Sequence, residues 1–161
     1  MKDIEKEAVD FFCKTGRLYG LKDLQMTIFA VLYLEPESMP MEEIAERTGY
    51  SLASISNTMK FMQNLGIVQR IKKPGSRKVY FFVEKNLIKL NIRKLRAAQD
   101  TFVKSMKTQL PPIIRKYKKK ARDEKSKQKL KIIENYYSQI KKFENILEDW
   151  RKDLEKLSQE M

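Results

Sequence analysis

The stretch that decides the fold is residues 41–83, which read MEEIAERTGYSLASISNTMKFMQNLGIVQRIKKPGSRKVYFFV. Its first nine residues predict a short helix that ends at Gly49, because glycine readily adopts the left-handed conformation that follows a helix. Ser51 can cap a second helix, over about residues 51–65, on which apolar side chains recur at steps of three and four. The predicted buried stripe of this second helix is Leu52, Ile55, Met59, Met62 and Leu65.

A basic hairpin follows the second helix. Gly66 ends the helix, and the segments IVQRIKK, PGS and RKVYFFV predict a strand, a tight turn and a second strand. Alternation along the second strand places Tyr80 and Phe82 on one face and Phe81 on the other, which favours core packing over an aromatic ligand box. Two short helices joined by a turn and followed by a hairpin define a winged helix-turn-helix.

The segments on either side of this motif are predicted to be helical. Residues 3–18 have an amphipathic pattern, and residues 22–34 become almost continuously apolar, which is typical of a buried central helix. After residue 85 a helix is expected to run until Pro111 and Pro112 break it, and a second helical stretch is expected beyond them.

The C-terminal part of the chain contains an apolar heptad repeat. Its a and d positions continue without interruption to Met161, and such a repeat needs an apolar partner along a helix about 40 Å long at roughly 1.5 Å per residue. We expect that partner to be the helix over residues 86–108, from the same chain or from a second copy. The predicted dimerisation residues are Ile133, Tyr136, Ile140, Phe143, Leu147, Trp150, Leu154 and Leu157.

The expected fold class is therefore mainly α with a small β-hairpin wing. We predict a winged helix-turn-helix domain over residues 1–85, which binds DNA, followed by long C-terminal dimerisation helices over residues 86–161. The small numbers of glycines and prolines, five of each, agree with helices joined by short connections.

Composition argues against several kinds of protein. The chain has no histidine, the commonest general base and metal ligand, and its single cysteine, Cys13, cannot form a disulfide within the chain. We therefore expect no enzyme, no metal and no cofactor. Cys13 is expected to be a buried packing residue, with redox sensing as the lesser alternative. The longest apolar run, residues 28–34, is too short to span a membrane, so a cytoplasmic protein is expected.

Positive charge indicates a polyanionic partner. The formal net charge is +13, and residues 51–83 contain six Lys and Arg side chains and no acid. The second helix of a helix-turn-helix lies in the major groove of DNA, where an asparagine such as Asn57 can contact adenine in a bidentate manner. Cations on the wing, about residues 72–78, can reach phosphates, and Arg77 is the preferred probe of the minor groove. The DNA contacts predicted from this chemistry are Ser54, Ser56, Asn57, Lys60, Lys72, Lys73, Arg77 and Lys78.

A plainer interpretation stays open for each of these charged or polar surfaces. An exposed helix face is often simply polar, and lysine-rich turns also occur as solvated edges of sheets. Residues 115–131 contain ten basic and two acidic side chains. They could bind phosphates that flank an operator, or they could be the solvated outside of a helical bend.

Residues 41–83 resemble the MarR superfamily, and most closely its GbsR-like branch. The resemblance implies leading helices, a winged core and trailing dimerisation helices over nearly the whole chain. It also implies DNA contacts at Ser51, Ser54, Ser56, Asn57 and Lys60 on the recognition helix, and at Arg77 and Lys78 on the wing. The wing lacks the Asp-x-Arg pattern of many MarR proteins and has PGSRK, so ligands of the wider family are not transferred to this chain.

We expect a homodimeric transcriptional regulator that binds double-stranded DNA. Two recognition helices about 34 to 36 Å apart would read the halves of an inverted repeat, and repression by blocking polymerase is the default mechanism. An unknown small-molecule effector would act where the arm joins the winged domain, by changing the separation of the recognition helices. Two alternatives remain: a sequence-tolerant architectural or chromatin-like DNA binder, and a helical protein-interaction module.

Overall fold

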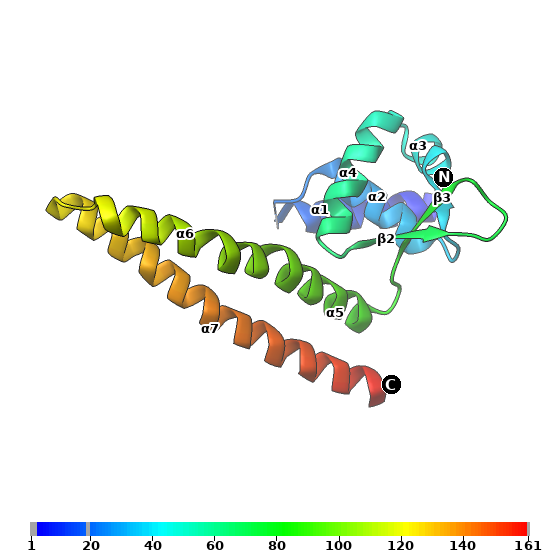
Figure 1. The fold of residues 1–161 in the computed structure, drawn as a ribbon. Coiled ribbons are helices and arrows are strands. Elements are labelled where there is room, and N and C mark those ends of the chain that lie inside the picture. Colours follow the sequence, from blue (N-terminus) through cyan, green and yellow to red (C-terminus); the bar gives the residue numbers. More distant parts are fainter. Residues whose placement is uncertain (1–2, 19, 161) are drawn as a thin grey trace. The chain divides into compact units, whose positions relative to one another are not determined.

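The computed structural model describes residues 3–18 and 20–160, and the chain divides into two compact units, Met1–Leu90 and Asn91–Met161. We call the first the winged unit and the second the arm. The predicted boundary at residue 85 precedes the helix α5 (Leu87–Ala97), whereas the compact units divide inside that helix. In chain order, the winged unit contains α1 (Asp3–Leu18), α2 (Asp23–Leu34), β1 (Met39–Pro40), α3 (Met41–Thr48), α4 (Leu52–Asn64), β2 (Val68–Lys72) and β3 (Val79–Val83) (Figure 1).

The predicted fold class is confirmed, because a mainly helical chain carries a small antiparallel sheet. The hairpin of β2 and β3 pairs Val68 with Val83 and Lys72 with Val79. A third strand, β1, pairs with the other edge of β3, so the strand order is β1-β3-β2. This strand was not predicted, because two residues are too few to show the alternation by which a strand is recognised.

The core of the winged unit forms where α2, α3 and α4 pack on the sheet. The prediction that Ile55, Met59 and Met62 of α4 are buried is confirmed, but the prediction for Leu52 and Leu65 is wrong, since these side chains are 50% and 38% exposed. They occupy the first residue and the C-cap of the helix, beyond the ends of the surface that the core covers. The buried cluster also includes Ile28, Val31, Leu32, Met39, Ile44, Val68, Phe81, Val83 and Leu90.

A smaller cluster holds α1 against α2. Val9 and Cys13 of α1 pack with Met26 and Ala30 of α2. The prediction that Cys13 is a buried packing residue is therefore confirmed. At the next turn of α1, a Cβ atom added to Gly16 would lie 2.2 Å from the Cγ atom of Met26. The close approach of the two helices thus depends on the absence of a side chain at residue 16.

Replacing Gly16 by alanine is expected to lower the free energy of unfolding by about 1 to 3 kcal/mol, the usual cost of overpacking. The higher helix propensity of alanine, worth roughly 1 kcal/mol, would act in the opposite direction but cannot remove the clash with Met26. Lys14→Ala, on the exposed side of the same helix, is the matched control and should change stability by less than about 0.5 kcal/mol. Urea denaturation measures the free energy of unfolding of both variants. A Gly16→Ala protein at least as stable as the wild type would contradict this packing.

Lys85 fastens the end of the wing to α2. Its ammonium group donates a hydrogen bond to the carbonyl oxygen of Leu32 and lies 4.6 Å from the ring centroid of Phe82. The hydroxyl of Tyr33 donates to the carbonyl oxygen of Lys85 at 2.9 Å. Burial lowers the pKa of Lys85, against the attraction of Glu35 and Glu84. Side-chain and backbone contacts therefore fix Lys85, two residues before the start of α5.

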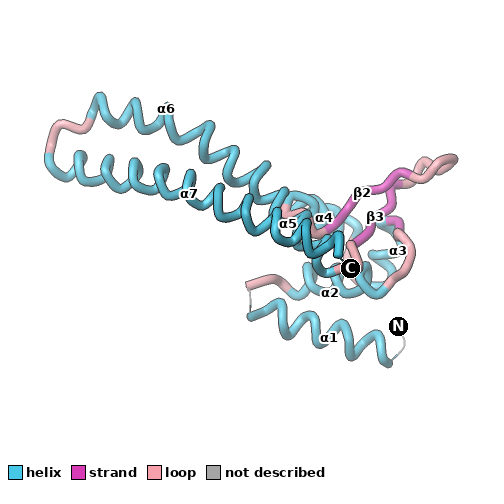
Figure 2. The backbone as a smooth tube through the Cα atoms, turned by 90° about the horizontal axis from the view of Figure 1, so that it is seen from below, coloured by secondary structure: helices cyan, strands magenta, loops and turns pink. Residues whose placement is uncertain are grey.

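The arm is a helical hairpin (Figure 2). Its first side is the continuous run of α5 (Leu87–Ala97), a π-helical segment η1 (Ala98–Val103) and α6 (Lys104–Lys120), and its second side is α7 (Glu124–Glu160). The predicted break at Pro111 and Pro112 is wrong, because both prolines lie inside α6. Each proline removes a hydrogen bond to the carbonyl four residues earlier. Those carbonyls belong to Lys107 and Thr108, which are exposed residues, so water can satisfy them.

The heptad repeat of α7 divides between two surfaces. The buried a positions Ile140 and Leu147 pack with Leu95 and Val103 of the same chain, and Leu154 packs against the edge of this cluster. Ile133, the first a position, is half-buried. The final a position, Met161, lies outside the described residues. The d positions are all exposed, and they are Tyr136, Phe143, Trp150 and Leu157.

Polar contacts reinforce this packing. Glu155 of α7 accepts a hydrogen bond from Arg96 of α5 at 2.6 Å, and Glu148 accepts one from Gln99 at 3.0 Å. Arg151 donates hydrogen bonds to both glutamates. Its hydrogen bond is the main cause that lowers the pKa of Glu148, and the hydrogen bond from Arg96 is the main cause that lowers the pKa of Glu155. One side of α7 is thus fixed to its own hairpin by apolar and ionic contacts.

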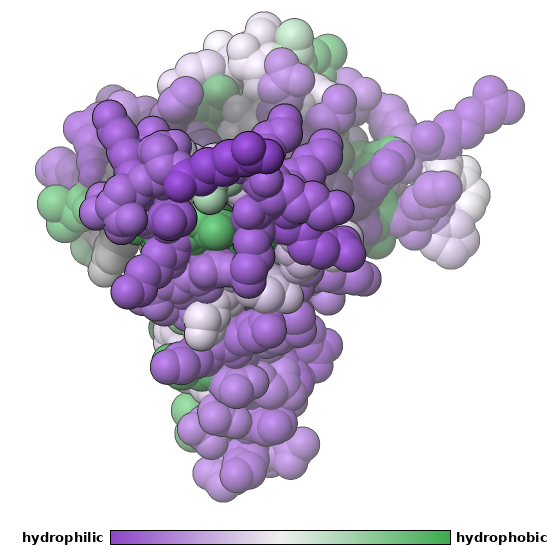
Figure 3. Space-filling view, turned by 60° about the vertical axis from the view of Figure 1, so that its left-hand side comes forward, coloured by the Kyte–Doolittle hydropathy of each residue, from purple (hydrophilic) through white to green (hydrophobic). Residues whose placement is uncertain are grey.

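The surface is rich in hydrophilic residues. Figure 3 shows a face on which they predominate, with small hydrophobic patches between them. Among residues 3–18 and 20–160, no helix combines the length and the apolar character that crossing a membrane requires.

Candidate nucleic-acid interface

The turn between α3 and α4 has the geometry that its sequence predicts. Gly49 has a φ of 74° and its amide donates to the carbonyl oxygen of Ala45 at 2.9 Å, which ends α3. Ser51 has extended backbone angles and caps α4, because its Oγ atom accepts a hydrogen bond from the Ser54 amide at 3.3 Å. The orientation of α4 on the winged unit is therefore set by a left-handed glycine and a serine cap.

The exposed face of α4 is centred on Asn57 and Lys60. Both side chains are exposed, and helical spacing places Ala53 and Asn64 beside them on the same face. Ala53 was not among the predicted contacts, although its small methyl group is suited to a close approach to base edges. No acidic residue lies on α4.

The predicted serines lie around this face and not together on it. Ser51 Oγ donates to Ser54 Oγ at 3.0 Å, so both hydroxyls take part in the cap. Ser54 and Ser56 are half-buried, and side chains two residues apart on a helix do not face the same way. Of the five predicted positions on this helix, Asn57 and Lys60 are thus the best presented to a ligand.

The wing presents its cations at a tight turn. Gly75 has a φ of 75°, and Ser76 closes the turn through its amide to the carbonyl oxygen of Lys73 and through its Oγ atom to the Lys78 amide. Lys72, Arg77 and Lys78 are exposed.

Two further cations of the hairpin have different surroundings. Lys73 lies 4.5 Å from the ring centroid of Tyr80 and 3.9 Å from a carboxylate oxygen of Glu37, so its charge is partly engaged within the winged unit. Arg70 is exposed on β2 but was not chosen as a contact. Arg70 also belongs to the acid-free stretch 51–83, which makes it a further candidate contact.

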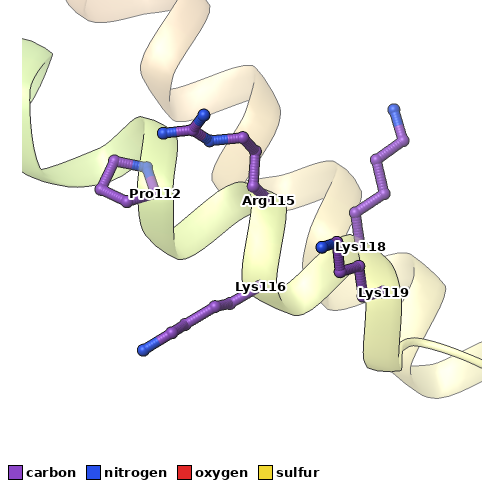
Figure 4. Close-up of a pocket in the computed structure, with 5 residues that line it drawn as sticks. All are labelled: Pro112, Arg115, Lys116, Lys118 and Lys119. Carbon is purple, nitrogen blue, oxygen red and sulfur yellow. The ribbon is translucent and has the colours of Figure 1, made fainter.

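A second basic surface lies at the closed end of the helical hairpin, around the turn between α6 and α7. We call residues 115–131, which include the α6–α7 turn, the basic tip. A pocket of about 510 Å³ here is lined by Pro112, Arg115, Lys116, Lys118 and Lys119, and Figure 4 shows Arg115 and Lys116 projecting to different sides of α6. Among the described residues, the only ion pair of the basic tip joins Lys118 to Glu134, at 3.8 Å.

If the basic tip binds DNA phosphates, replacing Lys118, Lys119 and Lys120 together by glutamine should flatten the slope of log affinity against log salt concentration by about one unit per lost contact. Glutamine replacements of Lys94, Lys152 and Lys156, elsewhere on the arm helices, remove the same charge and should leave the slope nearly unchanged. Affinity titrations at several salt concentrations measure both proteins. If the two triple variants had equal slopes of log affinity against log salt concentration, the basic tip would be a solvated surface that does not contact DNA.

These features define a winged helix-turn-helix fold, and comparison with known proteins agrees with it. Residues 19–78 match the family model described as MarR family. A crystal structure described as that of a transcriptional regulator is similar over 96% of this chain and 98% of its own, with a TM-score of 0.70 at 20% sequence identity. Residues 19–78 are therefore similar to the MarR family, and the chain as a whole shares the fold of that transcriptional regulator.

Two further structures are more distant. MepR, a transcription regulator of the Staphylococcus aureus multidrug efflux pump MepA, has 13% identity and a TM-score of 0.43, with 87% of this chain and 93% of that chain covered. The multiple antibiotic-resistance repressor MarR from Listeria monocytogenes has 16% identity and a TM-score of 0.40, over 86% of this chain and 88% of its own. No curated protein sequence matches the chain.

Proposed function

We propose that this chain is a sequence-specific DNA-binding regulator of transcription. The observation that carries the proposal is the presence, on one winged unit, of an exposed polar face on α4 and of exposed cations on the wing. No acid lies in residues 51–83, so the phosphate backbone would meet no repulsive charge from α4 or the hairpin. The fold supports this proposal.

Each surface has a distinct role in the proposed complex. The helix α4 enters the major groove, where Asn57 contacts a base edge and Lys60 contacts a base or a phosphate. Arg77 enters the adjacent minor groove, and Lys72 and Lys78 contact phosphates. The serine hydroxyls at the start of α4 orient the helix and contribute less to base recognition.

The proposed regulator is a homodimer that acts in the cytoplasm. Two winged units would read an inverted repeat whose half-sites lie about one helical turn apart, and repression by blocking polymerase is the default outcome. The PGSRK wing favours the GbsR-like branch of the family. A small-molecule effector, if one binds, would act near Lys85, where the wing is fastened to α2 ahead of α5.

Titration of a pool of random duplex DNA at about 50 mM salt tests the proposal. We expect binding whose log affinity falls steeply and linearly with log salt concentration, because each phosphate contact releases a counterion. Failure to bind duplex DNA at this low salt would exclude DNA binding. That result would favour the alternative that the chain is a helical protein-interaction module.

A further inference from the structure

One face of α7 is apolar and has no partner within the arm. Six large apolar side chains on this helix are between 42% and 68% exposed. Their spacing of three, four and seven residues places them on one side of the helix, next to the buried a positions. We call this set the apolar stripe, and it consists of Ile132, Tyr136, Phe143, Ile146, Trp150 and Leu157.

Within one chain, the arm buries fewer apolar side chains in its core cluster than the apolar stripe leaves exposed. Its core cluster consists of four buried residues, Leu95, Val103, Ile140 and Leu147. A helix of 37 residues with a continuous exposed apolar side is stable in water only when another surface covers that side. The apolar stripe therefore needs an occupant.

Charge along α7 identifies the occupant and its direction. Residues 124–142 contain six lysines and two glutamates, whereas residues 143–160 contain three basic and six acidic side chains. The two halves of the helix thus have opposite net charge. Two copies that lie antiparallel bring each basic half against an acidic half, while two parallel copies bring like charges together.

The free charges beside the apolar stripe are likewise basic along the first half of α7 and acidic along the second half. Lys131 and Lys142 flank its first half, and Asp149, Asp153 and Glu160 flank its second half, all of them exposed. Among the described residues none of the five has an ion pair or hydrogen-bond partner. Packed helices lie about 8 to 10 Å apart, close to the screening length of about 8 Å at physiological salt, so these charges still interact.

We propose that the apolar stripe of α7 pairs with the same stripe of a second copy in the antiparallel direction, with Ile146 near the two-fold axis. The two arms then form a four-helix bundle in which Tyr136 of one copy lies opposite Leu157 of the other. This inference rests on the proposed homodimer and adds its interface and direction. A two-fold pairing of this kind closes on itself and does not extend into a filament.

Disulfide trapping tests the direction in a Cys13→Ala background, which removes the native thiol. Two Tyr136→Cys helices paired in this way would have their residues 136 about 30 Å apart, far beyond disulfide reach. We expect Ile146→Cys to form a linked dimer with itself. Tyr136→Cys and Leu157→Cys should each stay unlinked alone but become linked when co-expressed.

The other outcomes distinguish a failure of the proposed interface from a failure of the proposed homodimer. Self-linkage of Tyr136→Cys would overturn the antiparallel direction and indicate a parallel pair. No linkage by any variant, in a protein whose mass is dimeric, would assign the dimer to another surface. A monomeric mass would contradict the proposed homodimer as well. Binding of the same proteins to duplex DNA, measured by fluorescence anisotropy, reports on the DNA-binding proposal independently of all three results.

Discussion

Replacing Asn57 by alanine is expected to raise the Kd for the DNA sequence that this protein selects by roughly 5- to 150-fold. That factor corresponds to the loss of about 1 to 3 kcal/mol when a bidentate contact to a base is removed. Asn57 is exposed near the middle of the face that α4 presents. Its side chain is not needed for folding, because the residues of α4 that pack in the core are Ile55, Met59 and Met62.

Asn64→Ala is the matched control for this prediction. Asn64 is also exposed and lies on the same side of α4, but it is the last residue of the helix, whereas the early residues of a recognition helix contact bases. Its replacement should change the Kd by less than about threefold. Anisotropy titrations on the selected duplex and on a scrambled duplex measure both effects. If Asn57→Ala bound the two duplexes as the wild type does, the assignment of α4 as the reading helix would be wrong.

The second large effect is expected at Trp150. Trp150→Glu places a charge in the middle of the apolar stripe and should raise the dimer dissociation constant at least about 30-fold, because buried tryptophans at interfaces commonly contribute 2 kcal/mol or more. Affinity for an inverted repeat should fall with it, since a monomer reads only one half-site.

Asn145→Glu adds the same charge at an exposed position away from the apolar stripe, and it should leave the dimer intact. Sedimentation velocity over a range of protein concentrations measures both proteins, and circular dichroism verifies that each retains its helices. A Trp150→Glu protein that remains dimeric at low micromolar concentration would exclude the apolar stripe as the interface.

Local sequence features predicted the recognition motif. Gly49 and Ser51 act through their own backbone and side chain, so the end of α3 and the cap of α4 follow from residue type alone. The hairpin was equally accessible, because the Pro-Gly turn and the strand pattern lie within a short window. What local features do not give is the extent of the core, which is why the exposure of Leu52 and Leu65 was missed.

The arm departs from the prediction for a related reason. A proline pair removes two hydrogen bonds. The helix α6 nevertheless continues through Pro111, because the residues that carry the freed carbonyls are exposed, so that water can reach them, and because the helix packs along α7. The heptad repeat predicted that α7 has an apolar side and left its partner open. Only the tertiary structure separates Ile140 and Leu147, buried within the chain, from the exposed residues available to a second copy.

Selection of bound duplexes from a random DNA library at roughly 150 to 200 mM salt tests the central claim most directly, because non-specific phosphate binding is weakened there. Enrichment of an inverted repeat, with half-sites about ten base pairs apart, is the result expected of a dimeric regulator that reads sequence through α4. Tight binding at low salt with no enriched sequence would contradict that claim and identify a sequence-tolerant architectural DNA binder.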